Sequence, residues 1–100
     1  MTIKTATLSA MPYAQAHVEI DEEGIIYLFS YVTCVATIAN DWLEVYGLYS
    51  STTRRHIGAF MKEYIEWPNG TRGEYKTAKM LYENGWRLNI ATGEIEDMPG

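Results

Sequence analysis

Three stretches in the first half of the chain carry the hydrophobic pattern of a β-sheet. In AQAHVEI, residues 14–20, apolar and polar positions alternate, which is typical of a strand with one buried and one solvent-exposed face. Residues 25–39 are apolar on both sides and alternate only after Ser30, so they predict one long bent strand or two strands. WLEVYG, residues 42–47, predicts a further strand, and residues 3–9 predict a weak one. The turns DEEG and AND separate these segments, and the first of them predicts a hairpin.

The pattern then changes to a helical period. Apolar residues recur at the spacing of one helical face, at Ile57, Phe60, Met61, Tyr64 and Ile65. Ser50 or Ser51 is the expected N-cap, because a serine hydroxyl accepts a hydrogen bond from a free backbone N–H one turn into a helix. WPNG, residues 67–70, is expected to end this helix.

The last third of the chain permits two interpretations. Thr71 and Glu74 have the spacing of a capping box, which predicts a second helix through EYKTAKMLYE that Gly85 closes. Alternatively, Asn84 and Gly85 form the turn of a hairpin with KMLY and WRLNI as its strands. We favour the helix. WRLNI and GEIE around the ATG turn then predict two short strands. The expected architecture is α+β: an antiparallel sheet of about four to six strands with one or two helices packed on one face.

Length and composition indicate a single domain over residues 1–100. Hydrophobic residues make up 47% of the chain and charged residues 21%, which is ordinary for a globular protein and argues against disorder. A net charge of −5 disfavours general attraction to nucleic acid or to an anionic membrane, although it permits a local basic patch. Cys34 is the only cysteine, and the N-terminal segment lacks a signal-peptide core, so a cytosolic protein is expected.

Familiar catalytic and metal-binding motifs are absent from the sequence. There is no G-x-S-x-G, no phosphate-binding loop and no G-x-G-x-x-G. His17 and His56 do not have the spacing of a zinc site with Cys34. A Cys34–His56 nucleophile pair stays open, but cysteine in an apolar alternation usually acts as a small buried hydrophobe. The acidic groups at 21–23 and 94–97 are expected to be solvated. We therefore expect no enzyme, no cofactor and no metal.

Residues 49–56, YSSTTRRH, are the strongest candidate for a binding site. A helix start presents free N–H groups and the positive end of the helix dipole, which together attract anions. Arg54 and Arg55 oppose that dipole, and a phosphate that accepted hydrogen bonds from N–H groups, hydroxyls and guanidinium would reverse the effect. The tyrosines just before the helix would stack on a base. The candidate ligand- or partner-binding residues are Tyr46, Tyr49, Ser50, Ser51, Thr52, Thr53, Arg54, Arg55 and His56.

The same segment also has a purely structural interpretation. Serine and threonine are the best helix caps. Arg55 shares a helical face with Ala59 and Lys62, the expected solvent side, and Glu44 is a candidate to neutralise either arginine. His56 would then hydrogen-bond only locally. A contact patch for another protein is the third interpretation of this segment.

Tyrosine is unusually frequent, with eight residues in the chain. Several cannot all be buried in so small a core, and aromatic side chains with polar tips are enriched at interfaces. This favours partner binding or self-association, whereas ordinary amphipathic strands are the alternative. The sheet half holds Tyr13, Tyr27, Tyr31, Tyr46 and Tyr49.

Two segments resemble a family of small proteins that phages and prophages of gut bacteria encode. That family has a sheet-forming part of the form SY.T.V..I and a helix of the form YS.TT.RHI..F. The matching positions here are Ser30, Tyr31, Thr33, Val35, Ile38, Tyr49, Ser50, Thr52, Thr53, Arg55, His56, Ile57 and Phe60. The resemblance covers residues 13–64. It implies a phage accessory protein in the host bacterial cytoplasm, and it brings no catalytic residue.

Three functions follow from this setting. The first is a non-enzymatic protein that binds and inhibits a host defence component, such as a CRISPR effector. The second is a sponge for a nucleotide signal, with residues 50–56 binding its phosphate. A small enzyme or a nucleic-acid-binding regulator ranks lowest. The expected partner is thus a host protein or a small nucleotide, with a homodimer as a further option and no membrane.

Overall fold

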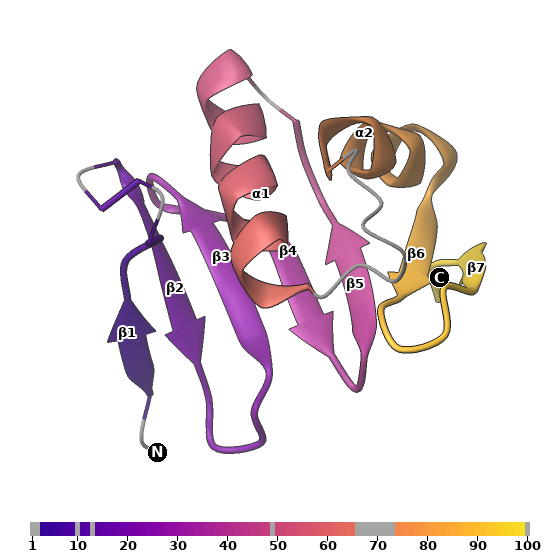
Figure 1. The fold of residues 1–100 in the computed structure, drawn as a ribbon, viewed down its shortest axis with the longest axis horizontal. Coiled ribbons are helices and arrows are strands. Elements are labelled where there is room, and N and C mark those ends of the chain that lie inside the picture. Colours follow the sequence, from indigo (N-terminus) through magenta and orange to yellow (C-terminus); the bar gives the residue numbers. More distant parts are fainter. Residues whose placement is uncertain (1–2, 10, 13, 49, 66–73, 100) are drawn as a thin grey trace.

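In the computed structural model, one antiparallel sheet forms the framework of the molecule, and every strand pairs with its neighbour in sequence (Figure 1). The structure describes residues 3–9, 11–12, 14–48, 50–65 and 74–99. Seven strands make up the sheet: β1 (Lys4–Ala6), β2 (Ala16–Ile20), β3 (Ile26–Ser30), β4 (Thr33–Ala39), β5 (Trp42–Val45), β6 (Trp86–Asn89) and β7 (Ile95–Asp97). The helices are α1 (Ser51–Tyr64) and α2 (Glu74–Asn84).

The α+β class is confirmed, but the predicted count of four to six strands was too low. The stretch 25–39 forms two strands instead of one, which raises the count to seven. The strands expected within residues 3–9 and GEIE are present as β1 and β7, each with three exposed residues. So short a strand shows no alternation of buried and exposed positions.

The apolar stretch 25–39 consists of two strands, the second of the two alternatives. Ser30 pairs with Thr33, so a turn of two residues, Tyr31 and Val32, joins β3 to β4. The register shifts between Leu28 and Phe29, which leaves Val35 of β4 as an extra, fully buried residue. This bulge explains why the pattern changes in this region, since an inserted residue interrupts the alternation of side chains.

Both helices lie on the same face of the sheet (Figure 1). Helix α1 packs on β3 and β4, α2 packs on β5 and β6, and the helices contact one another. The core between these layers is apolar, and its fully buried members include Val18, Leu28, Leu43, Val45, Ile57, Phe60, Met61 and Leu81. No described element covers the opposite face of the sheet, which we call the open face.

The ends of the helices follow the predicted signals. Ser50 caps α1, where its Oγ accepts a hydrogen bond from the N–H of Thr53 at 3.2 Å. Helix α2 confirms the helix over the alternative hairpin, and Gly85 follows it with a φ of 67°, a conformation that favours glycine. The WPNG stop signal and Thr71 of the predicted capping box lie outside the described residues. None of the described helices is long and apolar enough to cross a bilayer.

Because the strands are antiparallel, the turns between them lie alternately at two opposite ends of the sheet (Figure 1). We call the end that holds residues 30–33 and 50–56 the upper end. The lower end holds residues 21–25 and 39–42 and the last turn of α1. The predicted binding segment therefore lies beside the β3–β4 turn.

Candidate functional site

The β3–β4 turn presents two apolar side chains to solvent. Tyr31 is 53% exposed and Val32 is 92% exposed. Tyr31 also has a φ of 58°, in the left-handed region, which costs a residue with a Cβ about 1–2 kcal/mol. Positive φ at the first central residue alone is typical of a type II′ turn, where glycine is favoured. This hairpin tip, Tyr31–Val32, thus keeps bulky apolar residues where turn geometry favours other types.

A chain of polar side chains, buried except at Ser50, links the hairpin tip to the start of α1. Ser30 is 3% exposed, and its Oγ lies 2.8 Å from Nδ1 of His56 and 3.3 Å from Oγ1 of Thr53. The Thr53 hydroxyl in turn lies 3.3 Å from Oγ of Ser50. Buried polar groups are costly unless they are hydrogen-bonded. This network therefore fixes the helix start against the end of β3, and we call it the Ser50–Thr53–Ser30–His56 network.

His56 is held inside the protein in an environment that favours its neutral form. The side chain is 1% exposed, and burial lowers the pKa of His56 below its ordinary value of 6.5. The Tyr31 ring lies over it, with 6.0 Å between the ring centroids. Ser30 Oγ and His56 Nδ1 have the separation of a nucleophile and its base, but burial keeps both from substrate. The structural interpretation of residues 49–56 gave His56 a local hydrogen bond, but its partner Ser30 is distant in sequence.

The structure divides the nine predicted site residues. Thr53 and His56 are buried members of the network, and Ser50 is its exposed end. Ser51, Thr52, Arg54 and Arg55 remain on the surface of the first turns of α1, where Thr52 is half-buried and the others are exposed. Tyr49 lies outside the described residues, and Tyr46 lies on the open face of the sheet, away from the others.

Tyr46 takes part in a separate hydrogen-bonded group. Its hydroxyl donates to Glu44 at 2.8 Å and lies 2.8 Å from Oγ1 of Thr37. Burial, together with the hydrogen bond to Glu44, raises the pKa of Tyr46 to about 12. Strand alternation places Tyr46 and Glu44 opposite the buried Val45, so the structure does not bring Tyr46 to the helix start.

The two arginines at the helix start lie on the surface. Arg54 and Arg55 are exposed, and the first turn of α1 contains no acidic residue. Glu44 does not neutralise them, because it pairs with Arg87 at 3.6 Å. Within the described part of the chain, Arg55 forms no hydrogen bond or ion pair. An exposed guanidinium therefore lies one residue from the buried His56.

Several side chains of the open face form ring contacts, hydrogen bonds and ion pairs with one another. His17 stacks on Phe29, with ring centroids 4.9 Å apart, and its Nε2 lies 2.8 Å from Glu19. Arg87 lies over the Trp42 ring, 4.1 Å from its centroid, and also pairs with Glu44 and Glu96. The predicted tyrosine cluster is accordingly split, since Tyr27 and Tyr46 face this side whereas Tyr31 lies at the hairpin tip.

Cys34 lies on the open face as well. It pairs with Phe29 across the strands, and its Sγ donates to the carbonyl of Ala36 at 3.7 Å. His56 lies on the helix side of the sheet, so the two side chains do not form a nucleophile pair. Burial raises the pKa of the Cys34 thiol, which favours its unreactive protonated form.

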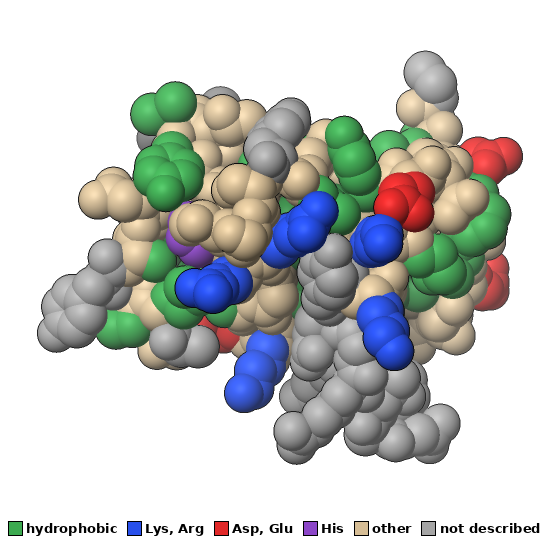
Figure 2. Space-filling view, turned by 90° about the horizontal axis from the view of Figure 1, so that it is seen from above, with side chains coloured by type: hydrophobic (Ala, Val, Ile, Leu, Met, Phe, Trp, Pro, Cys, Tyr) green, Lys and Arg blue, Asp and Glu red, His purple; other side chains and the backbone are tan. Residues whose placement is uncertain are grey.

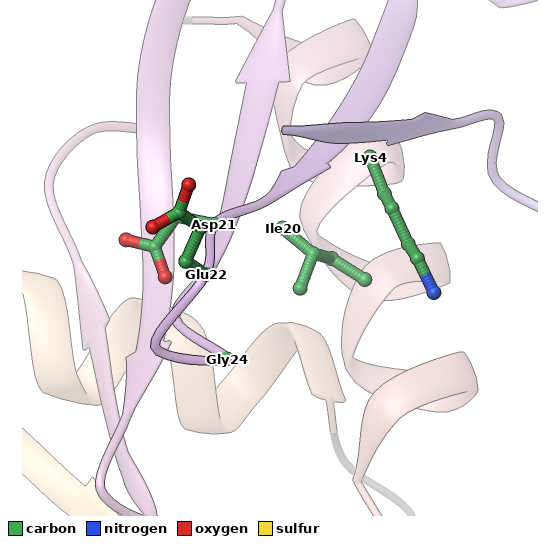
Figure 3. Close-up of a pocket in the computed structure, with 5 residues that line it drawn as sticks. All are labelled: Lys4, Ile20, Asp21, Glu22 and Gly24. Carbon is green, nitrogen blue, oxygen red and sulfur yellow. The ribbon is translucent and has the colours of Figure 1, made fainter. Parts of the chain in front are cut away.

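Two hollows of the surface lie away from the helix start. The larger has a volume of about 370 Å³ (Figure 3) and is lined by Lys4, Ile20, Asp21, Glu22 and Gly24. Asp21 serves the β2–β3 turn there: Oδ1 accepts from the N–H groups of Glu23 and Ile25 at 2.9 and 3.0 Å, and Oδ2 accepts from the Tyr27 hydroxyl at 3.0 Å. Lys4 points away from both carboxylates (Figure 3).

The smaller hollow has a volume of about 240 Å³ and is lined by Ser9, Ala59, Lys62 and Glu63. Across the described residues, no group of three or more His, Cys, Asp or Glu side chains is placed to hold a metal ion. In the smaller hollow, Glu63 accepts a hydrogen bond from the backbone N–H of Ser9 at 2.6 Å.

Sequence reasoning missed the hairpin tip and Ser30 as parts of the site. The tip lacks Gly, Asn and Asp, the residues that mark a turn, so the pattern gave no sign of chain reversal there. The family-like motif did include Ser30 and Tyr31, and this was the available signal.

A comparison with protein-family models gives a match over residues 3–84, which includes the hairpin tip, the buried network and both helices. No curated protein and no solved structure matches the chain. The matched range is far more than half of the chain, so the protein belongs to DUF8033, a family of unknown function.

Proposed function

We propose that this protein is a non-enzymatic phage accessory protein that binds and inhibits a bacterial host defence component, as anti-CRISPR proteins do, with the hairpin tip as its contact. The observation that carries the proposal is the tip itself. It combines a strained tyrosine at φ 58° with a valine that is 92% exposed. A single exposed apolar residue is ordinary, but strain and exposure of adjacent bulky residues mark a site kept for contact.

The contrast with the open face of the sheet supports a binding role for this tip. The aromatic side chains of the open face stack and hydrogen-bond among themselves. The tip, in contrast, rests on the Ser50–Thr53–Ser30–His56 network, which holds it rigidly. A contact that is fixed before binding loses less conformational entropy when the partner arrives.

A nucleotide sponge is the second candidate, and the geometry weakens it. Phosphate binding at the helix start was predicted to use Ser50, Thr53 and His56, but Thr53 and His56 are buried and hydrogen-bonded to Ser30, and the exposed Ser50 accepts from the N–H of Thr53. The exposed guanidinium of Arg55 is the observation that still favours a phosphate ligand.

The decisive experiment measures phage plating on bacteria that carry a defined defence system. Wild-type protein expressed from a plasmid is expected to restore plating on one strain of a defended panel. The variant Tyr31→Gly/Val32→Asn is expected to lose at least about 90% of that effect. Asn40→Gly, in the turn at the lower end, is the matched control and is expected to act like wild type. Full inhibition by the tip variant contradicts the proposal.

A thermal-shift panel separates the second candidate from the first. Cyclic nucleotides, cyclic dinucleotides and ADP-ribose-type molecules are each added to the purified protein. A binding protein that acts through its tip is expected to show no shift. A rise in melting temperature that Arg55→Ala abolishes would support the sponge instead.

A further inference from the structure

The hairpin tip and the first turns of α1 form one surface at the upper end. Ser30, the residue before the tip, lies 2.8 Å from His56 of α1, and the Tyr31 ring lies over the imidazole. Arg55 directly precedes His56 and is exposed. Figure 2 looks onto this end and shows basic side chains close to hydrophobic ones. An apolar tip therefore has cationic groups beside it, and we call Tyr31, Val32, Arg54 and Arg55 the upper-end patch.

Carboxylates are more frequent at the lower end than at the start of α1, although Lys4 and Lys62 lie at the lower end and Asp97 lies at the upper end. The upper end begins α1 with two arginines and no acidic residue in the first turn. The positive end of the helix dipole adds to this potential. The lower end and the last turn of α1 carry five carboxylates, on Asp21, Glu22, Glu23, Asp41 and Glu63. In a chain of net charge −5, the start of α1 next to the tip thus carries two arginines and no acidic residue in its first turn.

From this pairing we infer that the patch binds an acidic protein segment in which an apolar side chain is flanked by carboxylates. The inference rests on the proposed function and names the chemistry of its partner. The partner's apolar side chain meets Val32 and Tyr31, because burying them against it removes apolar surface from water. The partner's carboxylates meet Arg55, since guanidinium and carboxylate form charge-assisted, often bidentate, hydrogen bonds.

A protein segment fits this patch better than a nucleic acid does. Nucleic-acid affinity grows with the number of phosphates that cations neutralise, and the negative charge of the rest of the chain opposes a long polyanion. Val32, the most exposed apolar group of the tip, is aliphatic and offers no ring on which a base stacks. A short segment with a few carboxylates matches the few cations present.

The test selects peptides from a random linear library displayed on ribosomes, with the immobilised full chain as target. Enriched peptides are expected to carry Asp or Glu next to Leu, Ile, Val or Phe. Their affinity is then measured by fluorescence anisotropy at two salt concentrations. Arg55→Glu is expected to weaken binding at least about tenfold, Arg55→Lys much less, and raised salt is expected to weaken it further. Lys62→Glu makes the same charge change near the other end of α1 and is expected to leave affinity unchanged.

Folding does not confound this comparison. A glutamate in the first turns of a helix interacts favourably with the dipole, so Arg55→Glu is expected to fold at least as well as wild type, which circular dichroism verifies. Selection of no peptide, or of peptides without acidic enrichment, overturns the inference, as does equal binding by Arg55→Glu. Tighter binding of a 20-nucleotide single-stranded DNA or RNA than of the peptides also overturns it, because the partner class is then nucleic acid.

The two proposals fail in different ways. Peptide binding that needs the tip but not Arg55 removes the acidic partner and leaves the proposed function standing. The opposite result is that peptide binding needs Arg55 while Tyr31→Gly/Val32→Asn still inhibits the defence system fully. This result contradicts the proposed function and leaves the upper-end patch as a binding site with another role.

Discussion

Strand β4 is flanked by two turns of two residues that are built differently. The β4–β5 turn lies between the paired residues Ala39 and Trp42 and contains Asn40 and Asp41, with φ values of 51° and 68°. Asn and Asp tolerate the left-handed region better than other residues with a Cβ, so this turn follows local rules. The β3–β4 turn places a tyrosine in the same region and an exposed valine after it. Residue choice at the hairpin tip therefore serves something other than chain reversal.

The two turns are also held in different ways. The carbonyl of Asp41 accepts a hydrogen bond from the N–H of Ile90 at 2.7 Å, a contact between backbones. The hairpin tip has a backbone bond too, from the N–H of Tyr31 to Gln15 at 2.7 Å, but it also depends on the side chains of Ser30 and His56. A backbone anchor survives substitution, whereas the side-chain anchor makes the upper end sensitive to single mutations.

Transplanting the tip into the other turn is expected to have the largest effect. Asn40→Tyr/Asp41→Val forces two bulky residues, one of them β-branched, into the left-handed region. Each such residue costs about 1–2 kcal/mol, so the free energy of unfolding should fall by about 2–4 kcal/mol in a urea titration followed by circular dichroism. A fall below about 1 kcal/mol would mean that this conformation is cheap in this sheet and that strain at Tyr31 carries no information.

Removing the side-chain anchor is expected to be next in size. His56→Ala deletes a fully buried ring and leaves the Ser30 hydroxyl without its imidazole partner, which together cost about 2–3 kcal/mol. Amide hydrogen exchange should quicken first at the hairpin tip and the first turns of α1. His17→Ala is the control, because that ring is half-buried on the open face, and a loss as large there would deny the special role of the anchor.

The same anchor predicts a dependence of stability on pH. Burial lowers the pKa of His56 in the folded protein, so the unfolded chain binds more protons as the pH falls below the ordinary value of 6.5. Stability is therefore full above that pH and decreases toward acid, by at most about 1.4 kcal/mol per pH unit for one group. Urea titrations between pH 7.5 and 5 should show this decrease, and His56→Gln should remove most of it. An equal slope in the variant would assign the effect to other groups.

Local patterns predicted most of the elements because their signals lie within a few residues. The alternation in β2, the Ser50 cap and the Gly85 stop each belong to one segment. The number of strands was underestimated because the pattern of residues 25–39 left one strand or two open. The hairpin tip was not predicted because Tyr31 and Val32 are not typical turn residues. The bulge at Val35 also interrupts the alternation of side chains that would have marked where one strand ends and the next begins.

The candidate site was predicted less completely, for a different reason. The hydrogen bond between Ser30 and His56 joins residues far apart in sequence, and no local pattern contains it. Thr53 and His56, which had been assigned to a ligand, are therefore used inside the fold, and Ser50 is used as the helix cap. The exposure of Arg55 was predicted from the helical face on which it lies. The separation of Tyr46 from the helix start follows from the alternation of side chains in Glu44, Val45 and Tyr46, which the sequence already contains.

The smallest expected effect tests whether stability and contact have separate causes at the tip. Tyr31→Gly/Val32→Asn supplies residues that a type II′ turn favours, which relieves strain, but it also removes the Tyr31 ring from above His56. The balance should lie between no change and a gain of about 1 kcal/mol, or a rise of a few degrees in melting temperature. Tyr31→Ala/Val32→Asn keeps a Cβ in the left-handed region and should be about 1 kcal/mol less stable than the glycine variant. A tip variant that is as stable as wild type yet has lost inhibition shows that Tyr31 and Val32 are kept for the partner, whereas a variant that unfolds shows that they are kept for the fold.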